Sequence, residues 1–320
     1  MGRLTQHEAT YGGQAVIEGV MIRGPRHVAT ACRVADDRIV VHQEPTRSLL
    51  TRYRWLNIPF IRGTPALIDA LAIGFRSLIH SANLAVEAEG QKPPSPWYFT
   101  LSIAVAFVFG IGLFVLLPSA AIGRVTENSF LLNVLEGFAR LAIFVAYIAV
   151  INRMREVRRL FQYHGAEHKV VNAYEAGRPL TDADGFSVIH RRCGTGFIFN
   201  VIIVGILVHA VMGWPSFAIR LASRLVVLPV IAGIAYELTR LAGRYGDSLI
   251  VRALIAPGMW LERLTTAEPT ADQIEVAQRA MQAALDAERG VAAARIESEV
   301  PQGDESRAAS ELPADEDAVK

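Results

Sequence analysis

Two histidines and a glutamate in the middle of the chain are residue types that hold and use metal ions. His164 and His168 are four residues apart, so on a helix they share one face and present two imidazoles to a common point. Imidazole suits a borderline metal such as zinc, and two on one face make a bidentate site. The spacing therefore predicts a helix that holds a divalent metal, with zinc preferred.

Glu167 directly precedes the second histidine and completes the order His-x-x-Glu-His. This order is the reversed form of a zinc-peptidase motif. In that motif the histidines hold zinc and the glutamate activates a water molecule. Glu167 is accordingly the candidate catalytic residue, acting as a general base.

A second pair of residues supplies further candidate ligands. His190 and Cys193 have a spacing that lets an imidazole and a thiolate turn back onto one ion. A lone pair of histidines on a helix is more often an accident of the surface or core. Two such pairs in a chain with eight histidines and two cysteines favour a metal site. If all four residues bind, the coordination shell is closed and the site is structural.

Composition indicates a membrane protein. The chain has 320 residues, of which 52% are hydrophobic, and a net charge of +1, so no electrostatic argument favours nucleic acid. The apolar excess is concentrated between residues 97 and 239, as in a polytopic membrane protein. Two cysteines are too few for a disulfide framework and fit a reducing compartment. The first 25 residues lack the pattern of a signal peptide.

The N-terminal part is predicted to be a small cytoplasmic domain that contains β-structure. The run from Tyr11 to Pro25 has four glycines among fifteen residues, a density that permits close approach of another chain or a ligand. Residues 27–34 and 38–44 are predicted to form a β-hairpin. Glu18 and Arg23 lie in the glycine-rich run and are additional site candidates, with solvated loop charges as the alternative interpretation.

About four membrane spans are expected. The predicted spans are residues 93–123, 130–152, 194–219 and, with the weakest support, 225–236. The last has twelve uncharged residues, about 18 Å of helix against a hydrocarbon core of about 30 Å. It crosses if Arg220 and Arg224 reach the headgroups, and three spans with a re-entrant segment are the alternative. Within the second span, Glu136 and Arg140 are placed to pair.

Basic residues predict the orientation. Residues 153–192 contain eight lysines and arginines, so this loop is expected in the cytoplasm. An even number of spans then places both termini in the cytoplasm and the candidate ligands at the cytoplasmic mouth of the bundle. Glu237 falls at the same depth near the inner end of the fourth span. It is a further candidate, as a carboxylate ligand or a general base.

The predicted organisation is a mainly α-helical membrane bundle flanked by cytoplasmic parts. In chain order, the predicted regions are a β-containing domain (1–63), an interfacial helix and linker (64–96), the bundle (97–240) with a metal-site loop (153–193), a C-terminal helical segment (241–296) and a disordered acidic tail (297–320). In the helical segment, residues 256–269 are expected to be a loop with one helical turn. Thr270 and Gln273 form a capping box that starts a helix ending near Arg289.

Four stretches carry a resemblance to a known family: residues 12–25, 163–175, 190–197 and 260–266. They resemble the YqhQ-like family, bacterial membrane proteins of unknown function. The resemblance implies a metal-dependent enzyme in the bacterial plasma membrane. One departure is Arg191, which stands where the family pattern has proline and loosens the turn before Cys193.

Two functions from different classes follow. The first is a membrane-embedded hydrolase in which zinc is held by His164, His168 and a third ligand from His190, Cys193 or Glu237. The second is a membrane scaffold or transporter with a structural metal, in which Glu136, Arg140 and His209 line a polar path. The expected partner is the lipid bilayer, without nucleic acid. The sequence leaves the substrate and homo-oligomerisation open.

Overall fold

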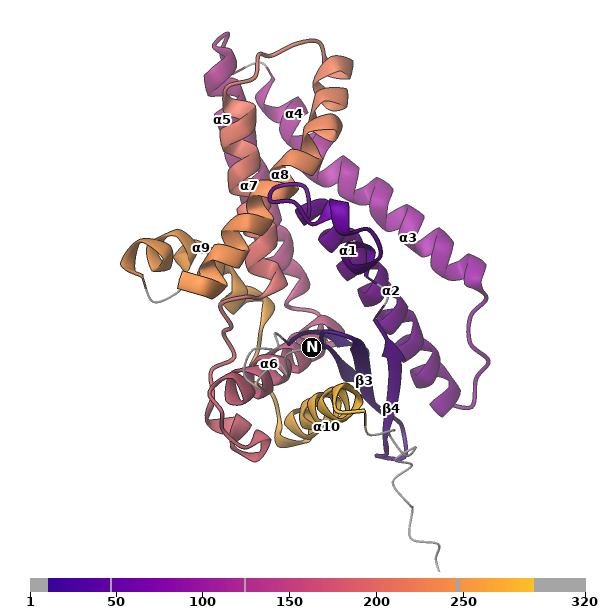
Figure 1. Ribbon diagram of the computed structural model, residues 1–320. Helices are drawn as coiled ribbons and strands as arrows, with labels where there is room; N and C mark the ends of the chain where they lie inside the picture. The colour runs from indigo at the N-terminus through magenta and orange to yellow at the C-terminus, as the bar shows by residue number, and fades with distance from the viewer. Residues whose placement is uncertain (1–10, 47, 124, 246–247, 291–320) are drawn as a thin grey trace, which may run out of the picture.

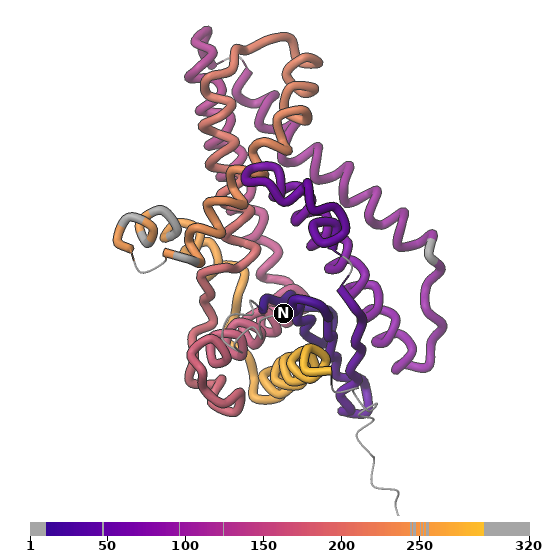
Figure 2. The backbone as a smooth tube through the Cα atoms, viewed as in Figure 1, coloured from indigo at the N-terminus to yellow at the C-terminus, as the bar shows by residue number. Residues whose placement is uncertain are grey.

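The computed structural model of the chain describes residues 11–46, 48–123, 125–245 and 248–290 (Figure 1). The fold is mainly helical, with one small antiparallel sheet near the N-terminus. An apolar helical bundle forms one end of the molecule, and a layer made of the sheet and two helices forms the other. Figure 2 shows that the indigo N-terminal strands and the yellow C-terminal helix lie side by side in this second layer. The predicted tail 297–320 is outside the described residues.

The sheet has four strands in sequential order. They are β1 (Gly12–Val16), β2 (Gly19–Arg23), β3 (His27–Arg33) and β4 (Ile39–Pro45). The predicted hairpin of β3 and β4 is confirmed. The glycine-rich run forms a second hairpin, β1–β2, for which no strands were predicted. At its turn Glu18 has a φ of +51°, and the next residue must be small, because a Cβ on Gly19 would lie 2.2 Å from the carbonyl oxygen of Ala31.

Helices cover both faces of the sheet. Helices α6 (Arg155–Glu175) and α10 (Ala271–Glu288) cover one face, and α2 (Gly63–Ala88) covers the other. Strand alternation divides the side chains between two cores. Val20 and Ala29 point to α6 and α10, whereas Met21 and Cys32 point to Ile73 of α2. Cys32 is buried.

The C-terminal helix returns to the N-terminal sheet. The capping box predicted at the start of α10 is present, and the backbone N–H of Thr270 donates to Oε1 of Gln273 over 2.9 Å. At the other end of α10, Glu288 forms an ion pair of 2.8 Å with Arg26 in the β2–β3 turn. The two ends of the described chain therefore lie on the same side of the bundle.

Among the residues that the structure describes, three helices are long and apolar enough, by length and composition, to cross a membrane. The first is Trp97–Ile122, which comprises α3 (Pro96–Ile111), a π-helical segment η2 (Gly112–Leu116) and α4 (Leu117–Ile122). The second is α5 (Ser129–Ile151), and the third is Phe217–Gly243 within α8 (Phe217–Tyr245). Helix α7 (Gly194–Ala210) is apolar but has 17 residues, about 25 Å.

Two predicted spans have different limits in the structure. The predicted third span, 194–219, was too long, because α7 ends at Ala210 and a break separates it from α8. The predicted fourth span, 225–236, was too short, because α8 runs through the arginines before it and the glutamate after it.

Ion pairs explain why α8 continues through these charged residues. Arg224 binds the carboxylate of Glu136, a fully buried residue of α5, and the predicted pair of Glu136 and Arg140 is also present at 2.9 Å. The guanidinium of Arg220 stacks on Trp214, 3.9 Å from the ring centroid. These charges are paired or stacked on aromatic rings in the bundle, which lowers the cost of placing them in an apolar helix.

The remaining elements connect the bundle and the layer. They are α1 (Leu49–Arg52), the 3-10 turns η1 (Arg54–Leu56) and η3 (Leu180–Gly185), and α9 (Leu249–Thr265). The prediction of a loop over 256–269 was wrong for residues 256–265, because the 17-residue helix α9 continues through Pro257 and ends at Thr265, and it is confirmed for residues 266–269. A proline removes one backbone donor and can kink a helix without ending it.

Candidate metal centre

Helix α6 places His164 and His168 together, as their spacing predicted. One side of α6 packs Ala166, Val170 and Ala173 against the sheet and α10, which fixes the rotation of the helix. Both histidines then project from a different side, with ring centroids 4.3 Å apart. Gly165 between them allows this fit, because a Cβ there would lie 2.2 Å from the carbonyl oxygen of Ala267.

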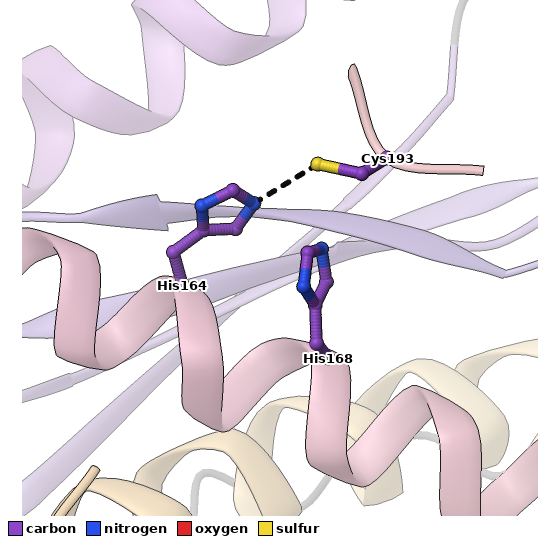
Figure 3. A group of neighbouring side chains, drawn as sticks. All are labelled: His164, His168 and Cys193. Carbon is purple, nitrogen blue, oxygen red and sulfur yellow. Dashed lines mark hydrogen bonds between the residues drawn. The ribbon is translucent and has the colours of Figure 1, made fainter. Parts of the chain in front are cut away.

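Cys193 brings a sulfur to the two imidazoles. It is the N-cap residue of α7, so the first turn of that helix sets its position. Its Sγ lies 3.3 Å from Nε2 of His164 (Figure 3). One ligand atom from each of His164, His168 and Cys193 lies within 4.8 Å of the others. The structure thus gathers two imidazoles and one thiol from α6 and α7.

Hydrogen bonds fix the orientation of both rings. Nδ1 of His164 is 2.8 Å from the carbonyl oxygen of Thr265. Nδ1 of His168 is 2.7 Å from the carbonyl oxygen of Val188 and 2.9 Å from Oε1 of Glu262. Since these partners are acceptors, each ring carries its proton on Nδ1 and has a free lone pair on Nε2 when neutral. This is how metal-binding histidines are commonly oriented.

The charges in the cluster favour a thiolate. Burial raises the pKa of Cys193, but hydrogen bonds and positive charge from His164 and His168 outweigh it and bring the pKa to about 6. Burial lowers the pKa of His168, whereas the negative charge of Glu167 and bonds to Cys193 and Glu262 raise it well above its ordinary value. Without metal, these shifts favour a thiolate on Cys193 beside a protonated imidazole of His168. This arrangement offers the donors that zinc prefers once the protons leave.

Glu167 lies beside the cluster, where a general base would be needed. Its side chain is 2% exposed, and Oε2 lies 3.4 Å from Nε2 of His168. Strand β1 covers it from the other side, since a Cβ on Gly13 would lie 2.6 Å from Cγ of Glu167. The glycine-rich run therefore contacts the candidate site through Gly13, a role that the sequence alone left unassigned.

His190 lies next to the group without joining it. Its ring centroid is 5.5 Å from that of His168, and its Nε2 is 3.3 Å from Oε1 of Glu175. Its backbone N–H donates to Glu262 over 2.7 Å. His190 thus supports the site through Glu262 instead of supplying a ligand atom in this geometry.

The other predicted candidates also lie outside the group. Glu237 forms two hydrogen bonds of 2.6 and 2.7 Å with Arg62, so its assignment as a ligand is corrected. Glu18 binds Arg159 and accepts a hydrogen bond of 3.2 Å from the hydroxyl of Tyr163. Arg23 is the last residue of β2 and is not part of the group.

Glu262 is a residue that the sequence-based reasoning missed. It is 1% exposed and accepts hydrogen bonds from the ring of His168 and the backbone of His190. The available signal was its position in the 260–266 motif that carries the family resemblance. A pocket between α7, α8 and α9 reaches both Glu262 and Cys193, and its polar lining includes Asn200 and Thr239.

Comparison with known proteins places the chain in a family. The family described as "Protein of unknown function (DUF1385)" matches residues 58–287. The chain belongs to this family. It is 36% identical over 286 residues to the "Uncharacterized protein YqhQ" of Bacillus subtilis (strain 168), covering 83% of this chain and 89% of that protein. No solved structure matches. The match includes the candidate metal centre, and neither description assigns an activity.

The two cysteines are expected to react very differently with alkylating reagents. In metal-free protein, the rate of Cys193 alkylation by iodoacetamide should rise with a midpoint near pH 6, because its pKa is lowered to about 6 and the thiolate dominates above it. Burial raises the pKa of Cys32 to about 12, so it should stay unmodified at neutral pH. Mass spectrometry of each peptide across pH measures both. A midpoint near the ordinary thiol value of about 8.5 for Cys193 would contradict the geometry.

Gly13 is expected to be intolerant of a methyl group, unlike its neighbour. In Gly13→Ala, the new Cβ would meet the backbone oxygen of Met21 at 2.5 Å and the side chain of Glu167 at 2.6 Å. The strain should cost about 1–3 kcal/mol of stability and displace Glu167. Gly12→Ala is the matched control, since nothing lies within 4 Å of its Cβ. Thermal unfolding of both variants in detergent measures the difference, and equal stability would contradict the contact.

Proposed function

We propose that the protein is a membrane-embedded, metal-dependent hydrolase with its site where the bundle meets the α/β layer. The observation that carries the proposal is a largely buried group of two imidazoles and one thiol with a carboxylate beside it. Three protein ligands and one open position are typical of catalytic zinc sites, whereas structural zinc sites have four protein ligands. The position of His190, bonded to Glu175, favours the three-ligand arrangement.

Each residue of the site has a distinct role in this proposal. Zinc would supply Lewis-acid activation of a water molecule and of the bond to be cleaved. His164, His168 and Cys193 would hold it, and Glu262 fixes the tautomer of His168 through Nδ1. Glu167 accepts the proton of the attacking water and delivers it to the leaving group.

The substrate would reach Cys193 through the pocket between α7, α8 and α9. Asn200 and Thr239 are hydrogen-bonded to each other over 3.1 Å at its wall and offer polar atoms on apolar helices. Such a boundary suits a substrate whose polar, hydrolysable group lies at the membrane surface. The ester, amide or phosphoester nature of that group is for the experiment to decide.

We also propose that the protein resides in the bacterial plasma membrane with both termini in the cytoplasm. Support comes from the basic residues before and within α6, and from the contact of α10 with the N-terminal sheet on one side of the bundle. The lipid bilayer is then the partner of the apolar helices.

The test is zinc-dependent hydrolysis by the purified protein in detergent or nanodiscs. The protein is stripped with a chelator, reloaded with zinc, and assayed against chromogenic esters, amides and phosphoesters. The expected result is a hydrolytic activity that chelation removes and zinc restores, with about one zinc per chain. Stoichiometric zinc without cleavage of any substrate class would instead support the alternative function, a membrane scaffold or transporter with a structural metal.

A further inference from the structure

The segment between β4 and α2 leaves the α/β layer and returns to it. It comprises α1, η1 and residues 57–62, and α2 then leads back to the sheet. Buried Asp69 on α2 holds the start of the segment: it accepts hydrogen bonds from the backbone N–H of Leu49 over 2.9 Å and from the hydroxyl of Ser48 over 2.7 Å. Residues 49–71 therefore form a hairpin-like excursion that the contact between Leu49 and Asp69 closes, with Phe60 near its tip.

The tip of this hairpin contacts the middle of α8. Val230 is the central residue of the apolar stretch Phe217–Gly243. The hydroxyl of Thr64 donates to the carbonyl oxygen of Pro229 over 3.2 Å, next to that centre. A Cβ on Gly233 would lie 1.9 Å from the carbonyl oxygen of Phe60, so the two backbones touch. The start of α2 contacts α8, and Figure 1 shows α1 and the start of α2 within the height of the bundle.

Large apolar side chains of the hairpin are exposed in this position. They are Trp55, Ile58, Phe60 and Ile61 near the tip, each at least 50% exposed, and Ile68 and Leu71 on the first turns of α2. Exposed patches of this kind mark contacts with a partner or a membrane. Because the tip contacts α8 at Gly233, about 4.5 Å along the helix from the central residue Val230, the environment that surrounds α8 also surrounds these side chains.

Several backbone N–H groups at the tip of the hairpin have hydrogen-bond partners, as an apolar environment requires. The N–H groups of Ile61 and Arg62 donate to the carbonyl oxygen of Ile58 over 3.1 and 3.0 Å. Phe60 has a φ of +66°, and its N–H donates to Glu237 over 3.3 Å. Glu237 also binds Arg62 in two hydrogen bonds, so one carboxylate pairs with the charge of Arg62 and caps the backbone at Phe60. This assigns a role to Glu237 other than metal binding.

We propose that residues 49–71 form a re-entrant membrane hairpin whose tip contacts lipid acyl chains near the middle of the bilayer. The inference rests on the proposed membrane location of the protein and adds to it a further lipid-contacting element. The occupant of the exposed apolar surface is the bilayer, since this surface is continuous with that of α8. The Arg62–Glu237 pair anchors the tip on α8.

Depth-dependent fluorescence quenching tests the proposal. The full chain, with its four tryptophans replaced by phenylalanine, receives a single reporter as Ile58→Trp and is reconstituted in phosphatidylcholine vesicles. The lipids are brominated near the headgroup, at mid-chain or near the chain end. The matched control is Val230→Trp on α8, which is 56% exposed against 50% for Ile58. A variant that retains only native Trp55 provides a tip reporter without a new side chain.

The expected result is that chain-end bromines remove the most fluorescence from both Ile58→Trp and Val230→Trp. Ile68→Trp should be quenched best by shallower bromines, because it lies five residues, about 7 Å, along α2 from Gly63. Deep quenching of Val230→Trp with only headgroup or aqueous quenching at Ile58 and Trp55 would overturn the hairpin and leave the membrane location intact. No lipid quenching at either position would overturn both.

Discussion

His168→Ala should leave the purified protein with almost no bound metal. Loss of an outer partner of a metal ligand typically weakens affinity by about 10- to 100-fold, so loss of a ligand itself should exceed about 100-fold. His168 is 2% exposed and contributes one of three clustered ligand atoms, which leaves His164 and Cys193 as an incomplete set. Elemental analysis of protein purified without chelator, expressed as metal per chain, measures the effect.

Two further histidine variants make this result specific. His42→Ala on β4 removes an exposed histidine and should leave the metal content unchanged. His190→Ala should also retain the metal, because its Nε2 faces Glu175 and not the cluster. Equal metal in wild type and His168→Ala would contradict the site. Loss in His190→Ala equal to that in His168→Ala would mean that four ligands bind.

Local spacing sufficed to predict one half of the site. The His164–His168 pair follows from helical periodicity within a single element, and α6 forms as a helix with the two rings in contact. The H-x2-C spacing also predicted Cys193 as a candidate ligand, and its sulfur lies in the group. Spacing alone did not indicate which of His190 and Cys193 would supply a ligand atom. In the structure, hydrogen bonds to Glu175 and Glu262 hold His190 outside the ligand group.

The wrongly selected residue Glu237 and the missed residue Glu262 both contact residues that are distant from them in the sequence. Glu237 was selected by its depth along α8, but depth does not specify which side of a helix faces the site, and it faces Arg62. Glu262 reaches His168 from α9, 94 residues away, and α9 was itself expected to be mostly loop. Neither composition nor periodicity encodes such a contact.

Membrane spans show the same limit. Hydropathy located the first two helices within a few residues, because their cores contain few charges. It misjudged α8, whose arginines and glutamate interrupt the apolar run in the sequence. In the structure these residues find partners on other elements: Glu136 on α5 for Arg224, and Arg62 before α2 for Glu237. A charged residue in an apolar stretch indicates whether the helix continues through it only once its ion-pair partner is known.

Glu167→Gln should separate an enzyme from a protein with a structural metal. Glutamine keeps the shape of the buried side chain and still forms hydrogen bonds, but it cannot accept a proton as a general base. Loss of general-base catalysis typically costs about 100- to 10,000-fold in rate, so hydrolysis and complementation of a deletion strain should both fail. Metal content and abundance in the membrane should match the wild type, because Glu167 borders the ligand atoms without completing the set.

Glu156→Gln is the matched control for this variant, because Glu156 is an exposed residue in the first turn of the same helix. It should retain full activity and metal content. Rates of zinc-reloaded protein, measured beside metal per chain, then distinguish the two roles of Glu167. If it were needed only for folding, Glu167→Gln would lose metal or abundance together with activity. If the metal were structural, Glu167→Gln would complement fully while His168→Ala failed. A rate loss with the metal retained leaves proton transfer as the step in which Glu167 acts.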